Sequence, residues 1–444
     1  MIKYFESEKK ENNVIINYVL NLLLSLYIVL PSYFAIEISK SIPLITASRI
    51  ILLVIVIGYI IHNNLKISVK VFYNLKYKYL IKLFFSLLIL VNMLHMLTDS
   101  YAKNEIFSIL FEKIVLLWIV VKTINTKKKV EDLLSMLSYV SGIVAIISII
   151  GLITGNNPFY YLTTTKREML QASFTRLGVV RAEAGFGHPV YYGIYINIMI
   201  FISLYLYENK NRKYIFCIIL NIIALFLCNS RGAIIPFIIL ILFKLIKEKN
   251  QLGIRLFMGI ISILVFLLLM HLISPQVASY IDNTLSSINV FLGEETSIEN
   301  YGTNAGLQKG INSRTNQLSG ILYTLKNKPL MGFGPQALSK GLIKYYVNDK
   351  WQTTNTYDVG YVSIFCKYGL IGFLAYLFLY IGIVINIYRK DLKTDKFVQL
   401  FRYLFLIYIL CMMSASMETK TAWIVLSIAI SYINVLKNES MQVK

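Results

Sequence analysis

The sequence is short of charge, and of negative charge above all. Only 15% of its 444 residues are charged, and 23 acidic residues stand against 44 basic ones, which gives a net charge of +21. With 57% hydrophobic residues and a mean hydropathy of +0.63, the chain lies outside the range of soluble globular proteins. The composition therefore predicts a polytopic integral membrane protein.

Cysteine and histidine are scarce too, at four residues each. The cysteines stand singly in apolar runs, without a CxxC pair and without histidine at ligand spacing, so neither a zinc site nor a disulfide framework is indicated. The sequence also has no Walker motif, Gly-rich phosphate loop or GxSxG motif. We therefore expect no metal, no nucleotide and no other cofactor.

Long apolar runs are plentiful instead. Crossing about 30 Å of hydrocarbon takes roughly 20 helical residues. Runs of about this length fall near 14–36, 43–61, 79–97, 106–124, 133–153, 189–207, 214–228, 233–247, 256–273, 360–388, 399–415 and 420–436. The first run lacks a small-residue cleavage site and is expected to be a span. The expected fold is an all-α integral membrane protein, a single polytopic domain over 1–444 with about twelve transmembrane helices.

The distribution of lysine and arginine predicts the orientation of these spans. Positive residues gather in the loops 62–78, 125–132, 208–213, 247–255 and 389–398, which alternate along the chain. By the positive-inside rule these loops and both termini are cytoplasmic. The positive charge then faces anionic lipid headgroups and gives no argument for nucleic acid. Two long segments, 154–188 and 274–358, are predicted to be external loops, and the second is expected to contain short helices.

The external segment 154–188 breaks the rule, because it carries Lys166, Arg167, Arg176 and Arg181. One interpretation is that the rule is statistical and flanking charges override it. The other is an external site for an anion. Arginine favours the second interpretation, because its guanidinium grips phosphate oxygens with two parallel hydrogen bonds and does not lose its proton.

Four stretches on the predicted external side combine polar residues with tight turns. They are RAEAGFGHP at 181–189, NSRGAII at 229–235, SRTNQLSGILYTLKNKPLMGFGP at 313–335 and DVGYVSIFCKYGLIG at 358–372. Pro189 is expected to start a helix, and Arg314 to begin a helical segment that ends at Pro329. Each stretch also has a structural interpretation: a snorkelling arginine, an aspartate that caps a helix, or an amphipathic helix lying on the membrane.

The order of these stretches over residues 180–375 resembles the O-antigen ligase and O-antigen polymerase (Wzy-type) superfamily of bacterial membrane glycosyltransferases. The shared features are the RAEAGFGHP stretch that opens a span, SRG, an arginine opening a large external loop, P-L-x-G-x-G, and a polar residue before G-[IL]-I-G. Ligases of the family have His-Asn where this chain has Asp358 and Val359. An acidic residue at this place resembles the polymerases. Residues 1–180 match no motif of the family.

The resemblance implies a transferase of the bacterial cytoplasmic membrane with an external active site. Its donor and acceptor would be oligosaccharides linked to undecaprenyl diphosphate, its surroundings membrane lipids, and its further partners a chain-length regulator and a flippase. Arg181, Arg231 and Arg314 would bind the diphosphate, and Asp358 would be the catalytic base of an inverting transfer. Additional substrate contacts would come from Arg176, His188, Tyr357 and Tyr361. Glu183 and Glu418 are the other acidic residues predicted near the external membrane face.

Three functions remain open at this point. The first is a polymerase that joins repeat units of a capsule, exopolysaccharide or O-antigen, and the second is a ligase that transfers the finished glycan to another acceptor. The third is a flippase or transporter of lipid-linked oligosaccharide. Transporters made of two halves tend to show an internal repeat, and none is visible here, so the polymerase is the expected function.

Overall fold

The computed structural model describes residues 2–38, 42–65, 68, 70–72, 75–99, 101–165, 174–176, 179–248, 304–347, 350–353, 357, 359–415 and 419–442. Helices make up most of these residues. In chain order they are α1 (Ile2–Val29), α2 (Ala47–His62), α3 (Lys78–His95), α4 (Ala102–Ser108), α5 (Leu116–Thr123), α6 (Lys127–Thr154), α7 (Pro189–Asn209), α8 (Ile215–Leu227), α9 (Arg231–Glu248), α12 (Asn304–Asn327), α13 (Gly360–Ile387), α14 (Lys396–Cys411) and α15 (Lys420–Gln442).

Shorter elements connect these helices. A π-helical segment, η1 (Ile109–Val115), joins α4 to α5, and three 3₁₀ turns are present: η2 (Pro158–Leu162), η4 (Arg212–Tyr214) and η5 (Lys390–Leu392). Three small antiparallel pairs interrupt the expected all-α fold: β1 (Ala35–Ile36) with β2 (Ile45–Thr46), β3 (Thr175–Arg176) with β4 (Val179–Val180), and β5 (Lys344–Val347) with β6 (Lys350–Thr353).

Each predicted apolar segment within the described residues contains a helix. However, 14–36 runs past the end of α1 into β1, and 43–61 includes β2 before α2 begins. The segment 256–273 lies outside the described residues. Four described helices are long and apolar enough to cross a membrane: α3, α6, α7 and α13. The apolar parts Val14–Val29, Ala47–His62 and Lys420–Leu436 are shorter. The protein is therefore a helical membrane protein, while the number of twelve spans stays a prediction.

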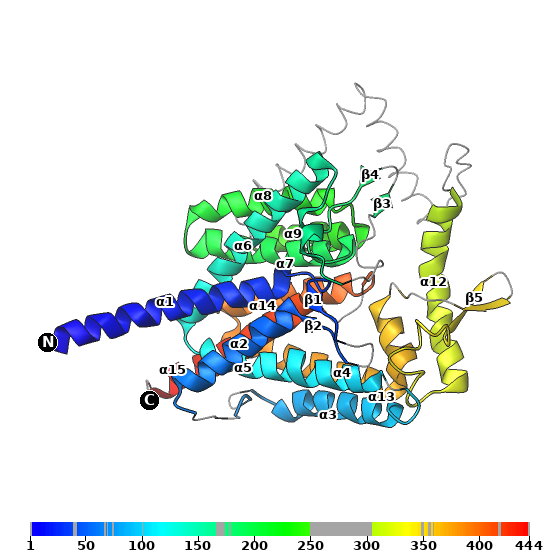
Figure 1. The fold of residues 1–444 in the computed structure, drawn as a ribbon, viewed down its shortest axis with the longest axis horizontal. Coiled ribbons are helices and arrows are strands. Elements are labelled where there is room, and N and C mark those ends of the chain that lie inside the picture. The colour runs from blue at the N-terminus through cyan, green and yellow to red at the C-terminus, as the bar shows by residue number, and fades with distance from the viewer. Residues whose placement is uncertain are drawn as a thin grey trace, which may run out of the picture.

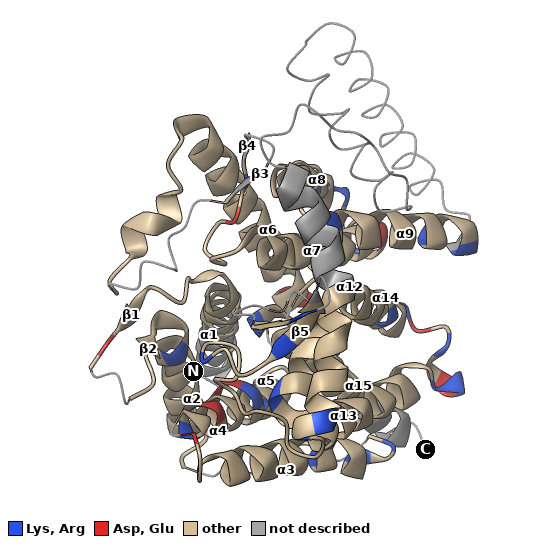
Figure 2. Ribbon diagram, turned by 90° about the vertical axis from the view of Figure 1, so that its right-hand side faces the viewer, with Lys and Arg blue, Asp and Glu red and all other residues tan. Residues whose placement is uncertain are grey.

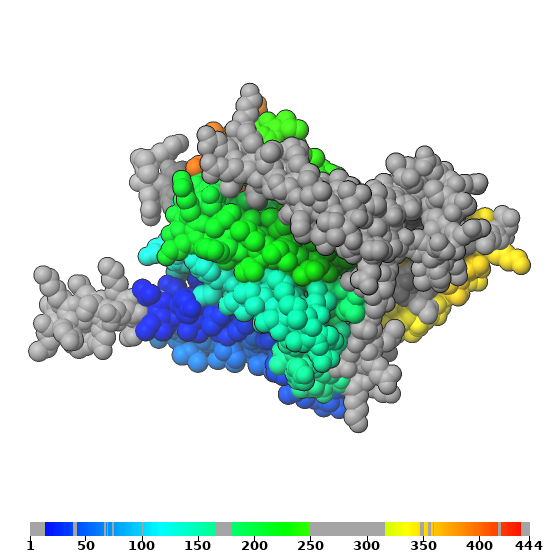
Figure 3. Space-filling model, turned by 90° about the horizontal axis from the view of Figure 1, so that it is seen from above, coloured from blue at the N-terminus to red at the C-terminus, as the bar shows by residue number. Residues whose placement is uncertain are grey.

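The surface of the bundle supports a lipid environment. On α6 the side chains of Ile143, Ile146 and Ile150 are 57%, 42% and 47% exposed, and their spacing puts them on one face of the helix. Figure 3 shows α6, α8 and α9 forming one continuous face beside α1. Large apolar stripes of this kind are unfavourable in water and typical of lipid-facing helices.

Polar side chains join helices inside the bundle. The hydroxyls of Ser138 on α6 and Ser203 on α7 lie 2.7 Å apart, and the Asn221 amide of α8 donates to the Ser141 hydroxyl at 2.8 Å. Hydrogen bonds of this type contribute to helix association in membranes, where burial of apolar surface gives no advantage over contact with lipid. Figure 2 shows correspondingly few charged residues along the helices of the body.

Figure 1 shows that the N-terminal end of α1 and the C-terminal end of α15 lie at the same end of the molecule. Helix α12 and the β5–β6 hairpin lie toward the opposite end. The helix expected to begin at Arg314 begins ten residues earlier, at Asn304, and ends before Pro329 as expected. That start was wrong because the first part of α12 is rich in glycine and asparagine, which are poor helix formers by intrinsic propensity.

Candidate functional site

The RAEAGFGHP stretch is bound to the end of α8. The Arg181 amide donates to the Phe174 carbonyl at 2.9 Å, and the Ala182 amide donates to the Leu227 carbonyl at 3.1 Å. The Arg181 side chain contacts the end of α8 as well: its Nε donates to the carbonyl of Cys228, the C-cap of α8, at 3.0 Å. A cation at this place is stabilised by the negative end of the helix dipole.

Three residues beyond Cys228, Arg231 begins α9. The turn between the two helices requires a left-handed backbone at Asn229, with φ 45°, and the Ser230 carbonyl accepts the first amide hydrogen bonds of α9. We call residues 228–231 the α8–α9 corner. It brings the stretches of Arg181 and Arg231 together, and it contains the N-terminal end of α9, whose partial positive charge favours an anion.

Helix α7 fixes the α8–α9 corner from the inside. The Asn197 amide of α7 donates to the Ala233 carbonyl at 3.0 Å, and a Cβ atom on Gly193 would lie 2.7 Å from the Ala233 Cβ. The start of α7 agrees with the expectation: Pro189 is its first residue, after Gly187 with φ +67°. His188 is the N-cap of α7, and its Nδ1 accepts from the Val190 amide at 3.1 Å.

The corner also contacts the segment after α14. Gly232 packs against Ser414, so closely that any Cβ atom on the glycine would overlap with the serine side chain. From the other side, the Gly360 amide at the start of α13 donates to the Met412 carbonyl at 2.9 Å. Residues 412–415, which carry no recognisable motif, therefore join the start of α9 to the start of α13.

Helix α12 completes the site. The amide of Val359 donates to the Oε1 atom of Gln317, a buried residue of α12, at 3.2 Å. Tyr357 is buried as well, and its hydroxyl lies against Gly320 one turn further along α12. Both neighbours of position 358 in the chain thus contact α12. Asp358 and Glu418 lie outside the described residues, and for Arg176 and Arg314 the structure describes the backbone alone.

Tyr361 is the second residue of α13, and its hydroxyl donates to the Ile409 carbonyl of α14 at 3.2 Å. The structure thus gives Tyr361 and His188 specific partners in the protein and buries Tyr357 in a small apolar cluster with Ala337 and Cys366. Their predicted contacts to substrate stay predictions. Arg231 lies at the α8–α9 corner, and Arg181 forms a hydrogen bond with Cys228 of the same corner. Arg314 precedes Gln317 by about one helical turn on α12.

The sequence PLMGFGP does not form a free turn but fills a break in α13. Gly369 has φ 60° and ψ −155°, which interrupts the helix. The carbonyls freed before the break accept from the turn: Cys366 from the Phe333 amide at 2.9 Å and Lys367 from the Gly334 amide at 2.8 Å. The amides freed after it donate to the turn: Leu370 to Pro329 at 2.9 Å and Ile371 to Leu330 at 3.1 Å.

The end of α3 holds this turn from its other side. The buried His95 bonds through Nε2 to the Met331 carbonyl at 2.8 Å, and Asp99 forms an ion pair of 3.2 Å with Lys340. His95 therefore has a hydrogen-bond partner in the turn. The large predicted external loop is therefore attached to the bundle through α3 and α13.

A second polar cluster lies next to Arg181 and includes Glu183, which is 4% exposed. One carboxylate oxygen accepts a hydrogen bond from the Tyr160 hydroxyl, and the Asn157 amide donates to the neighbouring Ala184 carbonyl at 2.8 Å. Burial raises the pKa of the Glu183 carboxyl, while hydrogen bonds from Tyr160 and Asn157 and the charge of Arg181 oppose the rise. These residues line a cavity of about 60 Å3 that also reaches Arg181.

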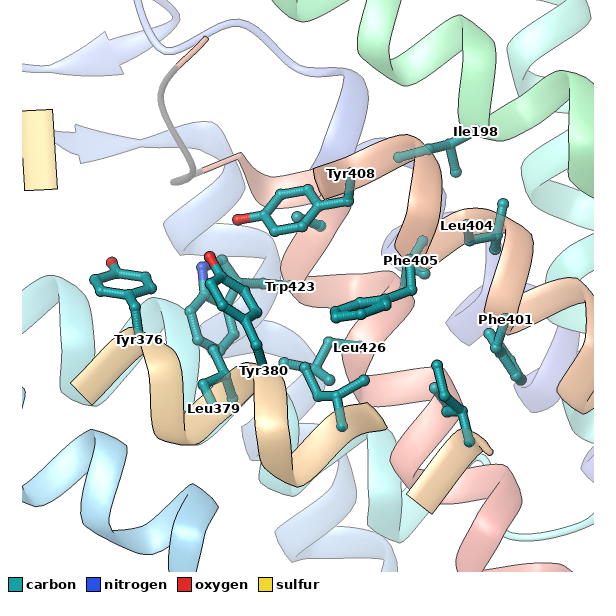
Figure 4. A pocket seen from close by; sticks show the side chains of 15 residues that line it. Ile198, Tyr376, Leu379, Tyr380, Phe401, Leu404, Phe405, Tyr408, Trp423 and Leu426 are labelled. Carbon is teal, nitrogen blue, oxygen red and sulfur yellow. The ribbon is translucent and has the colours of Figure 1, made fainter. Parts of the chain in front are cut away.

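An apolar groove runs along α13, α14 and α15 below residues 412–415. Figure 4 shows Tyr380 and Tyr408 projecting into it from α13 and α14, with Trp423 of α15 behind them. Its walls are almost entirely hydrocarbon and aromatic. At its upper end the Tyr380 hydroxyl lies 3.5 Å from the Met412 sulfur, so the groove adjoins the segment that joins α9 to α13.

The fold and site define a class: a helical membrane protein whose arginine-bearing segments converge at one corner of the bundle. The family model described as O-antigen ligase matches residues 216–377, from α8 to α13. Over these residues the match supports the resemblance to the O-antigen ligase and polymerase superfamily. The match contains the α8–α9 corner, α12 and the first part of α13 with its break at Gly369, while Arg181 precedes it. No curated protein matches the chain.

Proposed function

We propose that this protein is a polysaccharide polymerase of the bacterial cytoplasmic membrane. It joins oligosaccharide repeat units linked to undecaprenyl diphosphate on the external face, with inversion at the anomeric carbon and release of undecaprenyl diphosphate. The observation that carries the proposal is the convergence at the α8–α9 corner, where Arg231 begins α9 and Arg181 bonds to Cys228. Arginines beside the N-terminal end of a helix are suited to binding a diphosphate.

The reaction places growing negative charge on the leaving diphosphate as the bond from C1 to its oxygen breaks. Arg181, Arg231 and Arg314 stabilise that charge, and donors that are already oriented stabilise it most. The Ser230 hydroxyl is buried and has no hydrogen-bond partner among the described residues. It is a further donor within the α8–α9 corner for a phosphate oxygen.

The attacking group is a sugar hydroxyl of the acceptor, and Asp358 accepts its proton. The contacts of Val359 and Tyr357 with α12 support this role, because they fix the chain on both sides of position 358 against the helix that carries Arg314. Glu183 is the alternative base. Its burial and the hydrogen bond from Tyr160 favour instead a role in positioning the Arg181 segment.

The polyprenyl chain of the donor lies in the apolar groove of α13, α14 and α15 (Figure 4). Two features support this assignment: the lining has almost no polar surface, and Met412 at its upper end also contacts the start of α13. A polyprenyl tail held there would leave its diphosphate on the side of the α8–α9 corner.

A ligase that transfers the finished glycan to another acceptor is the second candidate, and the description of the matching family favours it. Deletion of the gene followed by analysis of surface and lipid-linked glycans separates the functions. Loss of a polymerase leaves single repeat units, loss of a ligase leaves lipid-linked polymer, and loss of a flippase traps single units inside. Restoration of long polymer by the wild-type gene, with Arg231→Ala as the matched inactive control, is the expected result. Accumulation of lipid-linked polymer in the deletion strain would overturn the polymerase assignment.

A further inference from the structure

A cavity of about 330 Å3 lies between α7, α9 and α14, far from the α8–α9 corner. Its lining is Phe201, Leu204, Tyr205, Glu208 and Asn209 of α7, Lys244 of α9, and Lys396, Gln399, Leu400 and Tyr403 of α14. From Arg231 to Lys244 the rise of an α-helix amounts to about 20 Å. The cavity therefore belongs to the other end of the bundle, which the lysine-rich loops predict to be cytoplasmic.

The polar part of this cavity is positively charged. Lys244 pairs with Glu208 at 3.1 Å, which neutralises one charge. Lys247 remains, with its Nζ 5.7 Å from the centre of the Tyr403 ring, and Lys396 is exposed at the first position of α14. Asp395, the residue before Lys396, carries a second negative charge, so the three lysines exceed the two carboxylates by one charge.

The carboxylate nearest to Lys396 in the chain, that of Asp395, forms hydrogen bonds with other residues. Asp395 caps α14 by accepting from the Val398 amide at 3.0 Å, and its other oxygen accepts from the Tyr432 hydroxyl of α15 at 2.8 Å. Both donors are neutral, so Asp395 keeps its negative charge but is held against α14 and Tyr432. One positive charge of the lysines remains in excess for an anion that enters the cavity.

The rest of the lining is apolar, with Phe201 and Leu204 on α7 and Leu400 on α14. An inorganic anion would gain nothing from these side chains, whereas a molecule with a charged head and a hydrocarbon tail would satisfy both parts. The volume equals that of about ten water molecules. That is enough for a phosphate ester and its glycerol.

We propose that this cavity binds the phosphate headgroup of an anionic phospholipid from the cytoplasmic leaflet, with the start of an acyl chain against Phe201 and Leu400. Basic pockets between transmembrane helices on this side of a membrane are suited to such headgroups. The binding ties α14 to α7 and α9, whose opposite ends form the candidate active site. It is independent of the reaction proposed above.

The test uses the full chain, purified in a nonionic detergent and freed of lipid. Phosphatidylglycerol, phosphatidylcholine with the same acyl chains, and inorganic phosphate are added separately, and thermal unfolding is followed at each concentration. We expect saturable stabilisation by phosphatidylglycerol alone. Lys244→Gln and Lys396→Gln should each weaken its apparent affinity by about fivefold. Lys390→Gln, which changes an exposed lysine of the neighbouring η5 turn, is the matched control and should change nothing.

Each other outcome overturns the proposal. Equal stabilisation by phosphatidylcholine would mean that the apolar lining alone binds lipid, and equal stabilisation by inorganic phosphate would mean a site for free anions. Unchanged affinity of the Lys396→Gln protein for phosphatidylglycerol would show that the headgroup does not bind in this cavity. This variant decides the matter even where Lys244→Gln fails to fold, because Lys396 is exposed and has no buried ion pair to lose.

Discussion

Gly332 and Gly369 meet backbone to backbone, so that a Cβ atom on Gly332 would lie 2.6 Å from the Gly369 nitrogen. Both glycines have positive φ, 68° and 60°. The PLMGFGP turn and the KYGLIG segment, which look like separate motifs in the sequence, are the two halves of one joint. Four main-chain hydrogen bonds close it, and its function is to hold the predicted external loop against α13.

The first prediction concerns this joint. Gly332→Ala and Gly369→Ala should each cost about 1–3 kcal/mol, because an L side chain is strained at these φ values and has no space. Limited proteolysis should then cut within residues 329–343, and polymer yield should fall. Gly58→Ala, where a Cβ atom meets nothing within 4 Å, is the control and should leave both readouts unchanged. A Gly369→Ala protein that resists the protease as wild type does would contradict the prediction that this joint holds the loop against α13.

The second prediction tests the diphosphate clamp. Alanine at Arg181, Arg231 or Arg314 should abolish polymer without loss of protein from the membrane. Lysine at the same positions should retain less than half of the wild-type amount, since it keeps the charge but loses the planar pair of donors. Arg212→Ala removes an exposed arginine of the η4 turn and is expected to be silent. Full activity of the Arg231→Ala protein would return that residue to a snorkelling role.

The third prediction separates two interpretations of Asp358. As a helix N-cap, its replacement by asparagine should cost a few tenths of a kcal/mol at most, because Asn caps nearly as well. As the general base, the loss of the proton acceptor should lower the rate by about 10²–10⁴ while the donor still binds. Polymer formation by Asp358→Asn protein, normalised to its amount in the membrane, is the measurement. A near-normal rate would exclude the base and turn attention to Glu183 and Glu418.

The fourth prediction follows from the raised pKa of Glu183. A folded-state pKa above the ordinary value of 4.5 means that the folded protein binds this proton more tightly than the unfolded chain. The resulting stability is complete below the ordinary value and is lost as pH rises through the raised one. Glu183→Gln keeps an acceptor for Tyr160 and does not titrate. Its melting temperature relative to wild type should therefore be higher at pH 8 than at pH 4, and the opposite trend would contradict the assignment.

The fifth prediction is the topology. Reporter domains fused after residues 70, 130 and 250 should be active in the cytoplasm, and those fused after 170 and 310 outside it, because lysine and arginine excess keeps loops inside. A cytoplasmic signal at 310 would remove the external active site and with it the proposed reaction.

Much of the helical framework could be predicted, because apolar length alone indicates a span. The start of α7 was predicted in detail, since Pro189 at the first position and Gly187 before it are strong local signals. Arg314 as the start of a helix was wrong. Local propensity could not indicate that α12 begins at Asn304.

The contacts between the motifs could not be predicted from the sequence. Nothing in PLMGFGP says that its amides pair with the carbonyls of Cys366 and Lys367, because main-chain hydrogen bonds leave no residue-type signature except glycine. Residues 412–415 could not be found for a similar reason, since they contribute backbone and a small side chain to the contacts of Gly232 and Gly360. The burial of Glu183 likewise depends on the return of the chain past Tyr160.

The break in α13 also bears on the order of synthesis. An unpaired main-chain group inside a membrane protein is costly, and α13 carries carbonyls and amides at Gly369 that no helical turn satisfies. Their partners, residues 329–334, precede α13 in the chain and leave the ribosome before it. These partners are therefore already present when α13 is synthesised. The joint can close as soon as α13 is made, before the C-terminal helices α14 and α15 are complete.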